Sequence, residues 1–228
     1  MRRGLLRVGV VSAYPPRRDG FAEDARDLVR SLGTECQVSV CAVGRPGLNY
    51  PAEVVVGAGV DELADYRRAG RVLAEHGVEA ALIRYADGIY GGPNGAHILD
   101  LAHELRRHGI PRIVSLLTVR VDAPAAWTRT AAALTAGAAA VLVPTETARA
   151  VALARRVAMA DQIRVVGAGV PAAVLSAAAP ASGRLRSRPR SPTRSAMRDR
   201  SSRQCALGGR ADRVECKRRL RPCANSPR

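Results

Sequence analysis

The stretch RVGVVSAYPPRRDGFAEDARDLVRSL, residues 7–32, decides the fold because it passes from one periodicity to another. Its first six residues form a short run rich in β-branched side chains. After a break that contains proline and glycine, Ala22, Ala25, Val29 and Leu32 recur at helical spacing. A strand followed at once by an amphipathic helix is the unit from which parallel sheets are built. We therefore expect a strand at 7–12 and a helix at 21–33.

The same alternation continues to residue 172. We expect further helices at 61–77, with Asp61 as N-cap, and at 96–109, 124–137 and 146–158. Further strands are expected at 37–43, 52–57, 80–85, 111–119, 139–145 and 162–170. Nearly continuous apolar strands between amphipathic helices are typical of a parallel sheet covered on both faces. The pattern predicts an α/β fold, a doubly wound Rossmann-like domain over residues 1–172.

Composition changes after Pro171. Residues 184–228 hold 15 Lys or Arg and three acids, a net charge of +12, which leaves +4 of the total +16 for residues 1–183. With few large apolar side chains, residues 173–228 are expected to form a disordered Arg/Ser/Pro-rich tail. Such a tail either contacts polyanions without sequence preference or is simply solvated.

Cysteine spacing and hydropathy exclude several classes of protein. The five cysteines form no metal-binding pattern, and Cys36 and Cys41, beside a predicted strand, fit buried free thiols. Neither a secretory signal nor an apolar run of membrane-spanning length is present. We expect a cytoplasmic protein without a metal or cofactor, in peripheral contact with a membrane at most.

Four loops that follow predicted strands carry glycine, proline or hydroxyl residues: 12–21, 85–95, 116–124 and 143–149. In doubly wound sheets ligands bind at the carboxyl ends of the strands. Free N–H groups at a helix start could there meet an anion or a sugar hydroxyl. The loops match neither G-x-G-x-x-G nor a Walker A motif. Spacing alone favours the interpretation that these glycines make tight βα turns that bind nothing.

Five segments in order resemble one known family. RVGVVSAYPPRRDGFAEDARDLVRSL, GIYGGPNG (88–95), SLLTV (115–119), VLVPTETAR (141–149) and IRVVGAGVP (163–171) are similar to landmarks of the amino-terminal domain of GT-B glycosyltransferases of family four. The resemblance covers roughly residues 7 to 172. It implies an acceptor-side domain, whose full-length relatives take a nucleotide sugar as co-substrate in a second domain.

On this resemblance, a sugar or lipid-linked acceptor would meet the strand-end loops, with Tyr90 stacked on a sugar ring and the other groups donating hydrogen bonds. The candidate acceptor-binding residues are Gly20, Gly88, Tyr90, Gly91, Gly92, Asn94, Thr118 and Thr145.

Departures from the family pattern argue against catalysis. Where relatives commonly read Gln-His-Glu-Tyr-Gly, Thr-Leu-His-Thr and Pro-His-Gly-Val, this chain reads RYADG (84–88), SLLT (115–118) and GAGV (167–170). The four remaining histidines fall on or beside predicted helices. No catalytic residue is therefore assigned.

After Pro171 the pattern of a donor domain is missing. The Arg-rich sequence there resembles the translation of a high-GC gene in the wrong reading frame. We expect a truncated, degenerate glycosyltransferase-like protein that is inactive alone. The alternatives are a binding module that uses its basic tail, and a half-enzyme that pairs with a separately encoded donor domain.

Overall fold

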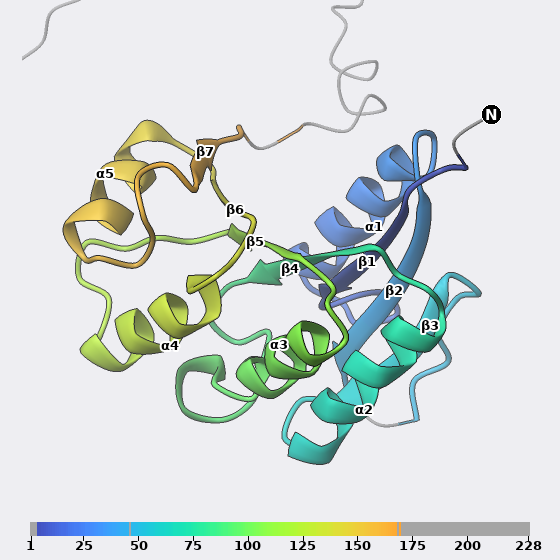
Figure 1. Cartoon of the computed structure of the whole chain (residues 1–228). Coiled ribbons are helices and arrows are strands. Elements are labelled where there is room, and N and C mark those ends of the chain that lie inside the picture. The colour runs from blue at the N-terminus through green and yellow to red at the C-terminus, as the bar shows by residue number, and fades with distance from the viewer. Residues whose placement is uncertain (1–3, 46, 168, 170–228) are drawn as a thin grey trace, which may run out of the picture. The chain divides into compact units, whose positions relative to one another are not determined.

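The computed structural model describes residues 4–45, 47–167 and 169, and within them strands and helices alternate as the sequence predicts (Figure 1). The elements are β1 (Arg7–Ser12), α1 (Gly20–Leu32), β2 (Gln37–Gly44), β3 (Val54–Gly59), α2 (Leu63–Glu75), β4 (Ala80–Tyr85), a 3-10 turn η1 (Pro93–Gly95), α3 (Ile98–Arg107), β5 (Arg112–Leu116), α4 (Ala125–Thr135), β6 (Ala140–Val143), α5 (Glu146–Ala154) and β7 (Ile163–Val165).

The strands of the described residues form one sheet in the order β3-β2-β1-β4-β5-β6-β7, and each neighbouring pair is parallel. This confirms the predicted α/β, Rossmann-like doubly wound sheet. The order reverses between β1 and β4, because β2 and β3 extend the sheet to one side and β4 to β7 extend it to the other. All carboxyl ends meet at one edge, the edge at which such sheets bind ligands.

The two faces of the sheet are covered unequally. Helices α2, α3 and α4 lie on one face and α1 on the other (Figure 1). Alternate strand residues divide between these faces, so that Val11 and Ile83 belong to the large core under α2 to α4. Val10 and Val40 belong to a small core under α1. Helix α1 packs mainly against β1 and β2. It therefore covers little of β4, β5 and β6 on this face of the sheet.

Side chains on the α1 side of β4, β5 and β6 are only half-buried. Leu82 pairs in register with Val10 of the α1 core and with Ile113, and Ile113 pairs with Ala140. Ser115 and Leu142 form the next pair towards the carboxyl edge. Among the described residues none of these five joins either core. We call Leu82, Ile113, Ser115, Ala140 and Leu142 the open sheet face.

An aromatic cluster fills the large core near the carboxyl edge. Tyr85 stacks with Tyr90 at a centroid distance of 6.1 Å, and Trp127 lies 6.0 Å from Tyr85. Tyr66 joins from α2, at 6.4 Å from Tyr90. Trp127 is the single tryptophan of the chain and is 2% exposed. Three tyrosines and one indole thus supply much of the aromatic packing in a chain that is otherwise packed by aliphatic side chains.

Two details differ from the sequence prediction. Glu62, not Asp61, occupies the N-cap position of α2, and its side chain accepts no capping hydrogen bond. The last strand extends only over Ile163–Val165, at the edge of the sheet, where it pairs with β6. No helix of the described residues is long and apolar enough to cross a membrane. The predicted tail, residues 173–228, and the boundary at 172 lie outside the described residues.

Candidate functional site

The glycines of the loop between β4 and α3 permit close packing within the domain. A Cβ on Gly91 would come 1.9 Å from the carbonyl oxygen of Val60. The Gly91 N–H donates to the Tyr66 hydroxyl at 3.1 Å. Gly92 has φ +75°, and a Cβ there would lie 2.5 Å from the His97 ring. At these two positions the glycine is required by neighbouring protein atoms.

Tyr90 is part of the core. Its side chain is 4% exposed, and its hydroxyl lies 3.0 Å from the Val11 carbonyl and 2.7 Å from the Arg84 carbonyl, either of which can accept its proton. Burial holds the pKa of the Tyr90 phenol well above its ordinary value. The hydroxyl thus links the ends of β1 and β4, where the strand order reverses. This placement favours a packing role over stacking on a sugar.

Five of the eight predicted site residues are exposed at the carboxyl edge or on its loops: Gly20, Gly88, Asn94, Thr118 and Thr145. Gly92 is half-buried, whereas Tyr90 and Gly91 are buried. Two of the exposed residues also have structural roles. The Thr145 hydroxyl caps α5 by accepting from the Ala148 N–H at 3.0 Å, and the Asn94 carbonyl accepts from the Tyr85 hydroxyl at 2.6 Å.

Polar contacts join three of the strand-end loops. Arg17, in the loop after β1, donates to the Gly88 carbonyl at 3.0 Å in the loop after β4. Arg120, in the loop after β5, lies 3.7 Å from the Asp87 carboxylate in that same loop. The topology therefore brings together the loops that the sequence singled out, although Tyr90 and Gly91 face inward.

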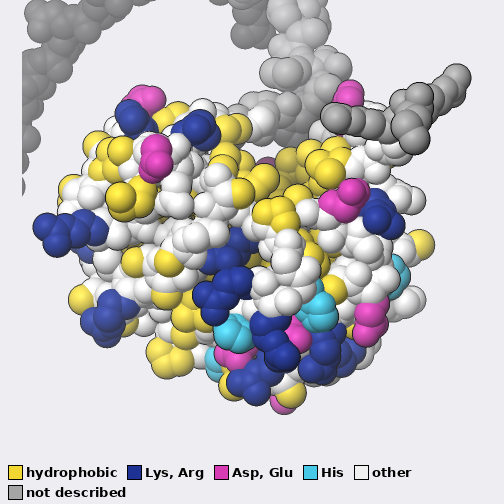
Figure 2. Space-filling model, viewed as in Figure 1, with side chains coloured by type: hydrophobic (Ala, Val, Ile, Leu, Met, Phe, Trp, Pro, Cys, Tyr) yellow, Lys and Arg dark blue, Asp and Glu magenta, His cyan; other side chains and the backbone are white. Residues whose placement is uncertain are grey.

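A pocket of about 680 Å³ opens between α1 and the open sheet face. Its walls are mostly apolar, with Phe21, Leu28, Leu82, Leu142 and Val166 among them. Figure 2 shows hydrophobic side chains gathered in a hollow at the upper side of the domain, where Figure 1 places the gap between α1 and β6. Of the eight predicted site residues, Gly20 lines this pocket.

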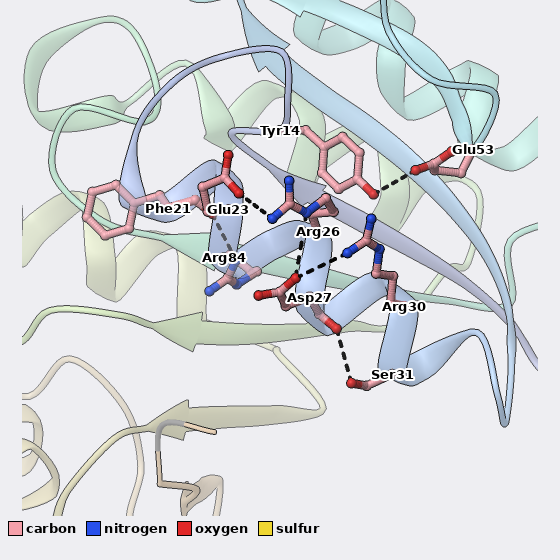
Figure 3. A network of polar contacts seen from close by, with 9 residues as sticks. All are labelled: Tyr14, Phe21, Glu23, Arg26, Asp27, Arg30, Ser31, Glu53 and Arg84. Carbon is pink, nitrogen blue, oxygen red and sulfur yellow. Dashed lines mark hydrogen bonds and ion pairs between the residues drawn. The ribbon is translucent and has the colours of Figure 1, made fainter. Parts of the chain in front are cut away.

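The polar end of the pocket is built around Arg84. This side chain is 3% exposed and forms an ion pair with Asp24 of α1, whose own side chain is 60% exposed. Arg84 also donates to the Phe21 carbonyl at 3.3 Å, which ties the end of β4 to the first turn of α1 (Figure 3). Further along α1, Arg26 and Arg30 pair with acidic residues of the same helix (Figure 3).

The start of α1 supplies the other charged groups at the pocket. The Asp19 carboxylate caps the helix by accepting from the Ala22 N–H at 2.8 Å, and it also pairs with Arg17. Ser12, at the end of β1, is fully buried, and its hydroxyl has no hydrogen-bond partner among the described residues. Both carboxylates at the pocket are thus engaged by arginines, which suits binding better than proton transfer.

The site has little catalytic chemistry of its own. None of the four histidines lines the pocket: His76 and His108 end α2 and α3, His103 is on α3, and His97 precedes α3. His97 packs against Tyr66, with ring centroids 5.6 Å apart. Within the described ranges no three His, Cys, Asp or Glu side chains gather as a metal site would require.

Apart from Gly20, the sequence prediction missed the residues that form the pocket. Arg84, Ser115 and Leu142 end apolar strands, and their importance follows from a register that brings them side by side. One signal was available, because Arg84 is the single charge within the apolar run AALIRY (80–85). A lone arginine in a buried strand needs a carboxylate partner, and Asp24 is that partner.

No protein-family model and no curated protein matches the sequence. Among solved structures, the UDP-N-acetylglucosamine 2-epimerase from Rickettsia bellii is similar with a TM-score of 0.52 and 14% identity, over 72% of this chain and 45% of that one. Two others have TM-scores of 0.49. Anabaena HepE in complex with UDP and glucose is 11% identical, over 72% of this chain and 45% of that one. Sucrose-phosphate synthase from Thermosynechococcus elongatus is 14% identical, over 75% and 94%.

The sheet order defines a Rossmann-like α/β domain, and its fold is similar to that of part of the Rickettsia bellii UDP-N-acetylglucosamine 2-epimerase. At such low identity the similarity shows the fold alone. The chain spans about 45% of the length of the Rickettsia bellii epimerase.

Proposed function

We propose that this chain is the acceptor-side half of a GT-B glycosyltransferase-like protein of family four, and that it binds an acceptor without transferring sugar by itself. The observation that carries the proposal is the pocket at the carboxyl edge, set beside the start of α1 and the end of β4. Sheets of this order bind ligands at that edge. A volume of about 680 Å³ lies within the range of small-molecule sites.

The chemistry of the pocket supports binding over catalysis. Among the described residues its lining contains no histidine or glutamate, and Asp19 and Asp24 are paired with Arg17 and Arg84. Sugar transfer needs donor and acceptor held in line, because the rate advantage comes from that placement. In the family that the sequence resembles, the donor is held by a second domain. This half therefore contributes acceptor affinity and orientation.

The proposal is tested by equilibrium titration of the full chain with simple sugars, an alkyl glycoside and a UDP-sugar, followed by calorimetry. We expect saturable binding of an acceptor and none of the UDP-sugar. Arg84→Met should weaken acceptor binding by about tenfold or more, which corresponds to about 1.4 kcal/mol. Arg67→Met is the matched control, because Arg67 also pairs with an aspartate, Asp100, 2.7 Å away between α2 and α3. Equal loss in both variants, or saturable UDP-sugar binding alone, would contradict the proposal.

A second candidate function rests on the charge of +12 in residues 184–228. These residues would attach the chain to nucleic acid or to an anionic membrane by releasing counterions. Such binding is sequence-independent and weakens steeply with salt. Replacing Lys217, Arg218 and Arg219 by serine should lower the salt dependence of DNA binding, whereas replacing Arg67, Arg68 and Arg71 of α2 should leave it unchanged.

A further inference from the structure

The sheet wall of the pocket changes from polar to apolar along the strands. Arg84 and Ser115 pair in register at the carboxyl ends of β4 and β5, and both line the pocket. Leu82 lies two residues before Arg84 on the same face of β4, about 7 Å further from the carboxyl edge. Leu142, which pairs in register with Ser115, makes the side towards β6 apolar as well.

Helix α1 repeats this order on the facing wall. It starts at the carboxyl edge, where β1 ends, and runs back to the amino edge, where β2 begins beside β1. Asp19 and Asp24 therefore lie at the end of the pocket that holds Arg84, and Figure 3 shows Arg84 beside the first turn of α1. Leu28 lies about one turn beyond Asp24. Both walls thus place polar groups at the carboxyl edge and leucines behind them.

We call Asp19, Asp24, Arg84 and Ser115 the polar corner, and it has no positive charge to spare. Among the described residues, Arg84 is the single basic side chain of the lining, and Asp24 already pairs with it. The side chains of Asp19 and Asp24 are 27% and 60% exposed. An anionic group would meet two carboxylates and one occupied guanidinium, whereas a hydroxyl group can donate to a carboxylate.

The start of α1 does not alter this balance. A helix N-terminus attracts an anion through its free N–H groups, but the Asp19 carboxylate already occupies that position, 2.8 Å from the Ala22 N–H. The polar corner is therefore suited to an uncharged group that carries hydroxyls.

The apolar part of the lining calls for a different kind of group. A free sugar has hydroxyls around its whole ring, and any that faced Leu28, Leu82 or Leu142 would lose water without gaining a partner. An aliphatic chain gains free energy from the same contact. The hollow of hydrophobic side chains in Figure 2 is where such a chain would lie.

We propose that the pocket binds a neutral glycolipid, with its hydroxyl-bearing head at the polar corner and its aliphatic chain along Leu28, Leu82 and Leu142. This inference rests on the proposed function, because it names the chemical class of the acceptor for the same pocket. It distinguishes that acceptor from a free sugar, which lacks the chain, and from a phospholipid, which carries an anionic head.

The first test is calorimetric titration of the full chain with three probes below their critical micelle concentrations: octyl glucoside, methyl glucoside and octyl phosphate. We expect octyl glucoside to bind about tenfold or more tightly than methyl glucoside, because burial of about two methylene groups supplies that factor. We expect octyl phosphate, with the same chain and an anionic head, to bind about tenfold or more weakly than octyl glucoside.

The outcomes separate this inference from the proposed function. Equal affinities for methyl and octyl glucoside would overturn the role of the chain and leave acceptor binding intact. Octyl phosphate that bound as tightly as octyl glucoside would overturn the neutral head. Failure of the proposed function has another signature, since neither glucoside would then bind saturably, and that result would overturn the inference as well.

The second test uses variants of the leucines. Leu28→Gln should reduce the advantage of octyl over methyl glucoside about threefold or more. Leu99→Gln is the matched control, because Leu99 is also half-buried on a helix, α3, which lies on the other face of the sheet (Figure 1). Leu142→Thr, which keeps a residue suited to a strand, should act like Leu28→Gln and guards against misfolding of that variant. An octyl advantage that Leu28→Gln and Leu99→Gln reduced equally would refute the placement of the chain.

Discussion

Gly91 and Gly88 lie three residues apart in one loop, yet they are glycines for different reasons. At Gly91 a side chain would overlap the Val60 carbonyl, whereas at Gly88 the space is open and only the φ of +79° disfavours other residues. Both lie in a segment that the sequence assigned to acceptor binding. The contacts assign Gly91 to packing and leave the exposed Gly88 available to a ligand.

Alanine substitutions separate these reasons. Gly91→Ala should lower the free energy of unfolding by about 3 kcal/mol or more, because backbone must move to admit the methyl group. Gly88→Ala should cost about 1 kcal/mol, the penalty of a left-handed conformation. Gly20→Ala, with open space and no positive φ, should change the value by less than about 0.5 kcal/mol. Urea unfolding gives all three, and a Gly91 variant as stable as the Gly20 variant would refute the packing role.

The two cysteines of the domain should differ in reactivity. Cys41 is completely buried in β2, whereas Cys36, in the turn before β2, is half-buried. A thiol reagent should modify Cys36 under native conditions and should reach Cys41 only when the domain unfolds. Burial shields Cys41 and raises the pKa of its thiol, and the thiolate is the reactive form. Peptide mass spectrometry after timed labelling distinguishes these sites from the three cysteines beyond residue 200. Labelling of both at one native rate would contradict this burial.

At the scale of the element, the starts of the helices show which side chains cap them. Asp19 and Thr145 each accept a hydrogen bond from a backbone N–H of the first turn of α1 and α5. Asp61 resembles them in sequence, yet α2 begins two residues later, at Leu63, with Glu62 in the N-cap position. A capping residue is therefore identified by where the chain turns as well as by its type.

The corresponding alanine variants should follow the structure and not the residue type. Asp19→Ala and Thr145→Ala should each destabilise the domain by about 1 kcal/mol, the usual value of a capping side chain. Asp61→Ala, which removes an exposed carboxylate without a capping bond, should change stability by less than about 0.5 kcal/mol. Differential scanning calorimetry of the three variants is the measurement. A loss at Asp61 equal to that at Asp19 would show that Asp61 caps α2 in solution.

At the scale of the whole molecule, buried acidic protons make stability depend on alkaline pH. Burial raises the pKa of the Cys41 thiol and of the Tyr66 phenol to about 12 each, and it raises the pKa of Tyr85 as well. In the unfolded chain the ordinary values are about 8.5 for Cys and about 10 for Tyr. Because the folded state holds these protons more tightly, their stabilisation is complete below about pH 8.5 and is lost as pH rises towards 12.

Unfolding by urea across this pH range tests the expectation. The midpoint should be constant near neutrality and should fall above about pH 8.5. Cys41→Ala should start from a lower stability because of the lost thiol, and it should show a shallower decline between about pH 8.5 and 10. An unchanged slope in this variant would mean that Cys41 ionises in the folded protein as it does in the unfolded one.

How much could be predicted from the sequence depends on the range of the interactions involved. The alternation of strands and helices is visible in the local periodicity of the sequence. The parallel sheet follows from it because connections between parallel strands are almost always right-handed. The pocket depends on the register between strands that are distant in the sequence, such as the pairing of Arg84 with Ser115, 31 residues further on, and no local pattern encodes that register. The burial of Tyr90 likewise depends on distant contacts, since the Val11 carbonyl beside its hydroxyl is 79 residues away in the sequence.

Trp127 gives the molecule an internal reporter of its own integrity. As the single indole of the chain, buried against Tyr85 in the large core, it should emit at short wavelength while α4 and the sheet remain packed, and nearby tyrosines should pass excitation to it. Opening of the domain would shift that emission to the red and end the transfer. Folding of this chain can therefore be followed by its intrinsic tryptophan fluorescence, without any label.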